Sequence, residues 1–93
     1  MTYEWHRRKA EVNFRKHGID FADAVGVFED VNLLWQEDVD AYDEVRHIAL
    51  GMDHLGRILV VIFVIQGESI RIISARRATK YERETYERRK RFP

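Results

Sequence analysis

The chain has 93 residues, 34% of them charged, with no cysteine, and its 16 basic and 16 acidic side chains leave no formal net charge. This length fits one domain, 1–93, and the lack of cysteine excludes disulfides, thiolate metal sites and a cysteine nucleophile. The start has no signal-peptide pattern, and the longest apolar run, 58–65, is too short for a membrane helix of about 20 residues. We therefore expect a cytoplasmic protein that contacts no membrane, since a fold without disulfides suits a reducing compartment.

Two helices are predicted in the first third of the chain. The first covers residues 6–17, where apolar side chains recur with helical spacing and Gly18 stands at the position where helices commonly end. The second begins after Asp20, a favourable N-cap, and ends near Phe28. Because both helices are amphipathic, we expect them to pack against one face of a sheet.

Four strands are predicted after these helices, separated by an acidic loop and by turns. Their ranges are 31–35, 45–52, 57–65 and 69–75. The short connections favour antiparallel neighbours, because a parallel crossover needs roughly a dozen residues. A last helix starts at Thr79, and Glu82 completes a capping box there. The sequence thus predicts an α+β domain with two N-terminal helices, a four-stranded antiparallel sheet whose second face is more polar and open, and a C-terminal helix.

Charge is distributed unevenly along the chain. Residues 71–93 carry nine basic and three acidic side chains, whereas residues 29–47 carry seven acidic side chains and one basic side chain, Arg46. A basic end suits a polyanion such as a nucleic acid, and the acidic segment suits a basic partner or solvent.

The arginines of the last predicted strand are the main candidates for binding phosphate. Strict alternation puts Arg71 on the same face as Ala75 and Arg77. A charge in mid-strand needs an open face or a partner, so Arg71 either pairs with a carboxylate, such as Glu68 or one in the acidic loop, or clamps a phosphate. Arg76 and Arg77 lie at the strand exit, before a helix N-terminus whose N–H groups favour anions, and solvated loop charge is the alternative.

A histidine and two tyrosines can serve acid–base chemistry or base stacking. His17, beside Lys16, can exchange a proton with the 2′-hydroxyl or the leaving oxygen of RNA, or it can simply cap the first helix. Tyr81 and Tyr86 can stack on bases or contact phosphate, and packing onto the sheet is the alternative for at least one of them.

Other kinds of site find less support in the sequence. His6, His47 and His54 show no metal-ligand spacing, so no metal site is expected. The carboxylates of the acidic loop are typical of solvated charge, and the chain lacks a Gly-rich phosphate loop and a Gly-x-Ser-x-Gly signature. The residues alone predict a polyanion-binding domain whose arginines can also support RNA cleavage by the internal 2′-hydroxyl.

Two segments of the chain resemble the signatures of the BrnT toxin family. The N-terminal segment includes Glu4-Trp5, Lys16-His17-Gly18 and Val27-Phe28-Glu29-Asp30, and Arg46, Ala49-Leu50-Gly51, Gly56 and Val60-Val61 continue it. The C-terminal segment includes Arg71-Ile72-Ile73-Ser74-Ala75-Arg76-Arg77-Ala78 with Glu82-Arg83 and Tyr86. The match covers nearly the whole chain in the expected order, and the Lys-His-Gly and Ile-Ile-Ser-Ala-Arg motifs together are specific.

The resemblance implies a RelE-like ribonuclease toxin of a type II toxin–antitoxin system, which cleaves RNA without a metal or other cofactor and arrests translation. It also implies a BrnA-type antitoxin with a ribbon-helix-helix part, through which alone the complex contacts operator DNA. The expected catalytic residues are His17, Arg71, Arg76 and Tyr86, and the expected RNA-binding residues are Lys16, Arg77, Lys80 and Arg83.

Alternatives to an active toxin remain open at this level. A non-catalytic module that binds nucleic acid or a partner, such as a toxin that has lost its activity, has the same charge pattern. A metal-dependent hydrolase that uses the acidic loop is a poorer fit. For an antitoxin, the C-terminal region or the exposed sheet face is the expected docking surface.

Overall fold

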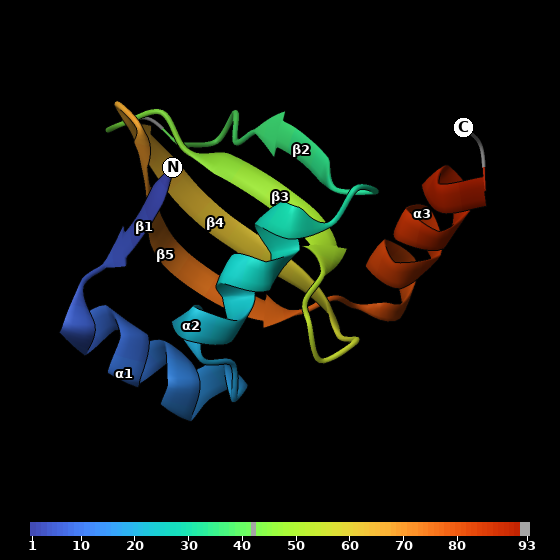
Figure 1. The fold of residues 1–93 in the computed structure, drawn as a ribbon, viewed down its shortest axis with the longest axis horizontal. Helices are drawn as coiled ribbons and strands as arrows, with labels where there is room; N and C mark the ends of the chain where they lie inside the picture. The colour runs from blue at the N-terminus through green and yellow to red at the C-terminus, as the bar shows by residue number, and fades with distance from the viewer. Residues whose placement is uncertain (42, 92–93) are drawn as a thin grey trace.

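The computed structural model describes residues 1–41 and 43–91, and these form one five-stranded sheet in the order β1-β5-β4-β3-β2 (Figure 1). In chain order the elements are β1 (Thr2–Trp5), α1 (Arg7–His17), α2 (Phe21–Ala24), the 3-10 helix η1 (Val25–Glu29), β2 (Leu34–Glu37), β3 (His47–Met52), β4 (Ile58–Gln66), β5 (Ser69–Arg77) and α3 (Lys80–Arg91). The α+β class is as predicted. None of the described helices is both long and apolar enough to cross a membrane.

The N-terminal helices agree with the prediction at their caps and differ in length. Gly18, at φ 71°, donates its N–H to the Phe14 carbonyl at 2.7 Å and ends α1. Asp20 caps α2 by accepting the N–H of Ala22 at 3.1 Å. The predicted second helix to Phe28 was wrong in kind, because α2 has only four residues before the chain tightens into η1. Two valines and a glycine at 25–27 explain this, since both residue types lower α-helical stability.

The predicted sheet of four antiparallel strands was incomplete. β2, β3, β4 and β5 are antiparallel neighbours, as expected from their short connections. A fifth strand, β1, adds to the outer edge of β5 in parallel, with Thr2 opposite Ser69 and Trp5 opposite Ile72. The sequence concealed β1 because four residues are too few for a clear alternation, and its partner strand lies at the other end of the chain.

Helices α1, α2 and η1 cover one face of the sheet, as predicted, and the main core lies between them and the strands (Figure 1). Phe21, Ala24 and Val27 from the helices and Val61 and Phe63 from β4 are each 0% exposed there. This packing fixes the position of β5, whose buried side chains belong to the same cluster.

The amide of Asn13 in α1 extends the hydrogen bonding of β5 beyond the end of β1. Its Nδ2 donates to the carbonyl of Ala75 at 2.8 Å, and its Oδ1 accepts the N–H of Ala75 at 3.1 Å. A side-chain amide thereby satisfies both backbone groups that a neighbouring strand would have bonded. No local sequence pattern predicts this contact, which anchors α1 to the part of β5 that carries the candidate site.

The second face of the sheet is less polar than predicted. Leu34, Ile48, Leu50 and Val60 lie there by strand register, and Val60 is only 4% exposed. Helix α3 lies alongside this face, next to β3. The apolar run 58–65 explains this difference, because alternation along a strand places its side chains on both faces of the sheet.

Candidate functional site

A β-bulge in β5 brings Arg71 and Arg76 to the same face of the sheet. Ile62 pairs with Ser74 but the next residue, Phe63, pairs with Ile72, so Ile73 is an extra residue in β5. The strict alternation used above was therefore wrong beyond this point, because a bulge exchanges the faces of all later residues. Arg71 and Arg76 pair with Val64 and Val60, which both point away from α1 and α2, whereas Ala75 points into the core.

Arg76 is held by Glu82, the residue in the first turn of α3. Its Nη1 and Nη2 donate to the two carboxylate oxygens of Glu82 at 2.8 and 2.9 Å, and Nη1 also donates to the carbonyl of Arg77 at 3.2 Å. The Arg76 hydrogen bonds lower the pKa of Glu82 to about 2, with the Thr79 backbone N–H as a further contributor. The Arg76 side chain stays 39% exposed, so a fixed cation lies at the surface.

Arg71 is paired with the acidic loop, as one of the two predicted interpretations proposed. Its Nη2 donates to both carboxylate oxygens of Glu44 at 3.0 Å. Its Nε is buried and has no hydrogen-bond partner among the described residues. Nε of Arg46 lies 3.9 Å from Oε1 of the same carboxylate, and it too is buried with no hydrogen-bond partner among the described residues. Two guanidinium groups thus share one carboxylate at this end of β5.

His17 and Lys16 line a shallow groove between α1 and the edge of β5. Ile73 and Ser74 form the strand side of this groove, and His17 is half-buried while Lys16 is exposed. Asn13, which holds Ala75, lines the same groove. The predicted acid–base residue therefore lies at the edge of β5 beside Ile73 and Ser74, and Arg76 is not among the residues that line this groove.

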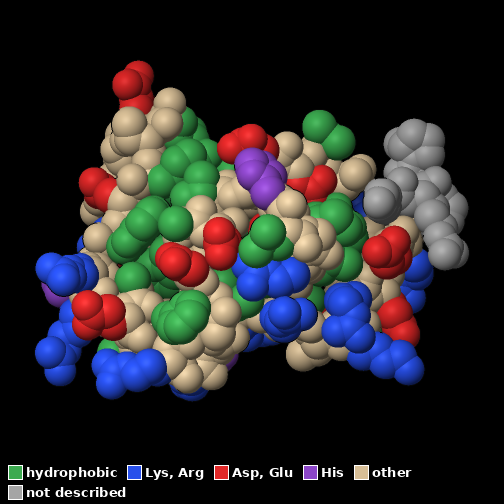
Figure 2. Space-filling view, turned by 60° about the horizontal axis from the view of Figure 1, so that its bottom comes forward, with side chains coloured by type: hydrophobic (Ala, Val, Ile, Leu, Met, Phe, Trp, Pro, Cys, Tyr) green, Lys and Arg blue, Asp and Glu red, His purple; other side chains and the backbone are tan. Residues whose placement is uncertain are grey.

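The remaining basic candidates surround the junction of β5 and α3. Arg77 is exposed at the end of β5, Lys80 is exposed at the start of α3, and Arg83 donates to the Ala78 carbonyl at 3.2 Å. Figure 2 shows Lys and Arg side chains along the lower part of that view, from the side of α1 to the side of α3. Strand register places Arg77, which is opposite the buried Leu59, on the other face of β5 from Arg76. Lys16 lies on α1 at the edge of β5, so Lys80 and Arg83 are the candidates that follow Arg76 at the start of α3.

Tyr86 is buried, unlike the other predicted site residues. Its side chain is 1% exposed, and its hydroxyl donates to Oδ2 of Asp30 at 2.5 Å. Burial raises the pKa of this phenol, and the neighbouring Asp30 carboxylate raises it further. The geometry favours the packing interpretation for Tyr86, while Tyr81 is exposed.

Sequence reasoning recognised Glu82 only as a cap. That part is confirmed, because Oε1 of Glu82 accepts the N–H of Thr79 at 2.8 Å and Oγ1 of Thr79 accepts the N–H of Glu82 at 3.2 Å. The second role, as the partner of Arg76, was missed. A basic residue shortly before a capping box is a signal that could have found it, since the cap fixes where the carboxylate lies.

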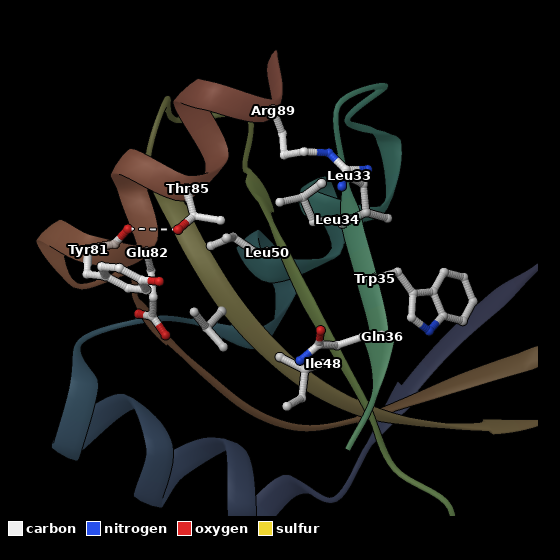
Figure 3. Close-up of a pocket in the computed structure, with 11 residues that line it drawn as sticks. Leu33, Leu34, Trp35, Gln36, Ile48, Leu50, Tyr81, Glu82, Thr85 and Arg89 are labelled. Carbon is white, nitrogen blue, oxygen red and sulfur yellow. Dashed lines mark hydrogen bonds between the residues drawn. The ribbon is translucent and has the colours of Figure 1, made fainter. Parts of the chain in front are cut away.

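A groove of about 610 Å³ separates α3 from β2 and β3 (Figure 3). Leu33, Leu34 and Leu50 are among its apolar residues, and the α3 side carries Tyr81, Glu82, Thr85 and Arg89. The indole of Trp35 points away from the other lining side chains (Figure 3) and packs against Phe63 and His47 on the opposite sheet face. Glu82 therefore lies between two features, with Arg76 on one side and this groove on the other.

The described residues contain no group of three or more His, Cys, Asp or Glu side chains arranged to hold a metal ion. The carboxylates nearest the arginines, Glu44 and Glu82, are engaged with guanidinium groups.

Comparisons with known proteins identify the family of this chain. Residues 5–82 match the family described as "Ribonuclease toxin, BrnT, of type II toxin-antitoxin system". The chain belongs to the BrnT family. Its structure is similar to the crystal structure of the Brucella abortus ribonuclease toxin BrnT, with a TM-score of 0.63 and 27% sequence identity over 86% of this chain and 100% of that chain. No curated protein matches the chain. The resemblance drawn from the motifs is confirmed, and membership of a BrnT toxin family implies an antitoxin partner.

Proposed function

We propose that this BrnT-family chain is an endoribonuclease that cleaves RNA without a metal ion and thereby arrests translation in the cytoplasm. The observation that carries the proposal is the Arg76 guanidinium, which is held by Glu82 at the end of β5, is partly exposed, and is followed by Lys80 and Arg83 at the start of α3. A rigid guanidinium binds a phosphodiester through paired hydrogen bonds and stabilises the charge that develops during cleavage.

Each predicted residue receives a role in this proposal. Arg76 binds the scissile phosphate, and Arg71 contacts the RNA once Glu44 releases it. His17 transfers a proton to or from the 2′-hydroxyl or the leaving oxygen. The RNA backbone is bound by the exposed or rim cations Lys16, Arg77, Lys80 and Arg83. We assign Tyr86 to packing rather than to chemistry, because its buried hydroxyl is already bonded to Asp30.

The partner in this proposal is a BrnA-type antitoxin. Its ribbon-helix-helix part is the part of the toxin–antitoxin complex that contacts operator DNA. The docking surface for the antitoxin is the groove between α3 and the second sheet face, which combines the two regions predicted from the sequence. The apolar floor of Leu33, Leu34 and Leu50 suits the apolar side of an antitoxin segment, and Glu82 and Arg89 give the rim both signs of charge.

Purified protein incubated with RNA, with and without a chelator, tests the activity. We expect cleavage that resists the chelator and that falls strongly in Arg76→Ala. Arg7→Ala is a matched control, because Arg7 is 93% exposed on α1 and contacts only Glu11 among the described ion pairs. Binding without cleavage would favour the non-catalytic module, and cleavage abolished by the chelator would favour a metal-dependent hydrolase.

A further inference from the structure

Arg76 donates from only part of its guanidinium. The donors on Nη1 go to Glu82 and to the Arg77 carbonyl, and one donor on Nη2 goes to Glu82. The Nε–H and the other N–H of Nη2 have no partner among the described residues, and they lie on the same edge of the planar group. On this edge the two N–H groups are parallel, so they can donate to two oxygens of one phosphate.

Glu82 is fixed in its turn by the capping box. Its Oε1 accepts both the Thr79 N–H at 2.8 Å and Nη1 of Arg76 at 2.8 Å, so the helix start and the guanidinium share one oxygen. The Glu82 backbone N–H is bonded to Thr79 in return. The first turn of α3 therefore fixes the position of the Glu82 carboxylate. Because Nη1 and Nη2 of Arg76 are bonded to this carboxylate, the position of that turn also determines where the guanidinium lies.

Helix α3 is held in place mainly through Tyr86. Among the side chains of α3 that the structure describes, Tyr86 is the one that is buried, and the helix has no aliphatic residue. The Asp30 carboxylate that receives its hydroxyl also accepts the N–H groups of Met52 at 2.8 Å and Asn32 at 2.9 Å. This bond ties α3 to the end of β3 and to the segment before β2.

We infer that Glu82 is a positioning residue for the RNA-cleaving site: it holds the end of the Arg76 guanidinium so that the Nε edge faces the phosphate, and the Tyr86–Asp30 bond keeps α3, and with it Glu82, in register. The inference rests on the proposed function. An arginine side chain that is free to rotate loses much conformational entropy when it binds, and a clamped one has lost it beforehand. A misplaced charge also costs more in the transition state than in the ground state, so the clamp acts on kcat rather than on KM.

Glu82→Gln separates the clamp from the cap. The glutamine carbonyl oxygen still accepts the Thr79 N–H, but the side-chain NH2 group now faces Nη2 of Arg76, donor against donor. Thr79→Ala is the matched control, because it removes the cap oxygen that accepts the Glu82 N–H and leaves both bonds between Glu82 and Arg76. Both variants are compared at a temperature well below their melting points.

The expected result for Glu82→Gln is a kcat lower by at least about 10-fold with KM within about 3-fold of the wild type, and for Thr79→Ala both constants within about 3-fold. Glu82→Asp, which keeps the charge, should recover part of the loss. Adding Glu82→Gln to Arg76→Ala should cost nothing further, because the residue acts through Arg76. A fully active Glu82→Gln, an equal loss in Thr79→Ala, or additive losses in the double variant would each overturn the inference.

A measurement without catalysis separates this inference from the proposed function. The Arg76 Nε–H signal in nitrogen-15 NMR should report an ordered side chain in the wild type and in Thr79→Ala, and a mobile one in Glu82→Gln. An equally ordered Nε–H in Glu82→Gln would overturn the clamp even if RNA is cleaved. Conversely, an ordered Arg76 whose removal leaves cleavage unchanged would show that the clamp exists and that the proposed site is wrong.

Discussion

The two ends of β5 carry the same kind of residue on the same face and hold it differently. At the α3 end, Glu82 binds the two terminal nitrogens of Arg76 and leaves the Nε edge without a described partner. At the other end, Glu44 places both of its oxygens on Nη2 of Arg71, and the Nε of that arginine is buried. One guanidinium therefore has an Nε edge with no partner among the described residues, whereas the other must rearrange before its buried Nε can bind an anion.

The difference comes from the elements that supply the two carboxylates. Glu82 belongs to the first turn of a helix, where a capping box fixes its side chain. Glu44 belongs to the loop between β2 and β3, and it also lies 3.9 Å from Arg46. A carboxylate that serves two guanidinium groups from a loop neutralises charge but orients neither group well. An arginine–glutamate pair can thus orient the guanidinium for binding, as Glu82 does for Arg76, or occupy it, as Glu44 does for Arg71.

The largest effect should distinguish the two arginines directly. Arg76→Ala should lower kcat/KM for RNA cleavage by about 100-fold, and Arg71→Ala by about 10-fold, because only Arg76 presents a bidentate edge without rearrangement. Steady-state cleavage of one RNA substrate by both variants, with circular dichroism to verify folding, measures this. Equal losses, or a larger loss for Arg71→Ala, would mean that the free edge of Arg76 has no catalytic value.

A second prediction breaks the link that holds α3 at the Arg76 end. Tyr86→Phe leaves the ring in place but removes a hydrogen bond to the Asp30 carboxylate, so the free energy of unfolding should fall by about 1–3 kcal/mol. Tyr81→Phe is the control, because Tyr81 is 72% exposed and should change stability by less than about 0.5 kcal/mol. Urea unfolding measures both variants. Unchanged stability together with lost cleavage in Tyr86→Phe would restore the catalytic assignment of this residue.

A third prediction releases the Arg71 end. Glu44→Gln removes the carboxylate shared by Arg71 and Arg46, so both guanidinium groups become available to phosphate and the Kd for a non-cleavable RNA should fall by about 3-fold. Asp40→Asn removes an exposed charge from the same loop and serves as the control for net charge. Equal tightening in the two variants would show that only the overall charge matters and that Arg71 does not contact the RNA.

The features near the two ends of β5 differ in how well the sequence predicts them. The capping box at Thr79 and Glu82 and the cluster of arginines were readable because they depend on local spacing. The bulge at Ile73 could not be predicted, because nothing in the residue itself shows that one position of β5 lacks a partner on β4. This single extra residue places Arg71 and Arg76 on the same face of the sheet. The pairing of β1 with β5 and of Glu44 with Arg71 was unreadable for a related reason: each joins segments that only the finished fold brings together.

The smallest expected effect concerns pH and tests whether the Arg76 pair stabilises the fold. The pKa of Glu82 is lowered to about 2 in the folded protein, first through the hydrogen bonds from Arg76. A lowered pKa in the folded state means that the ionised carboxylate stabilises the fold above its ordinary pKa of 4.5, and that this contribution disappears as the pH falls to about 2. The wild type should therefore exceed Glu82→Gln in free energy of unfolding by about 1 kcal/mol near neutral pH, a modest value because the pair is partly exposed.

Urea unfolding across this acid range follows the difference, with Glu84→Gln on the exposed side of the same helix as the matched control. The gap between wild type and Glu82→Gln should narrow steadily as the carboxylate takes up its proton. A gap of constant size would mean that it does not arise from the ionised carboxylate, and that the ion pair with Arg76 does not stabilise the fold. Glu82 would then orient Arg76 without adding to the free energy of unfolding. The two ends of β5 would differ in how their guanidinium groups are oriented but not in how much their ion pairs stabilise the fold.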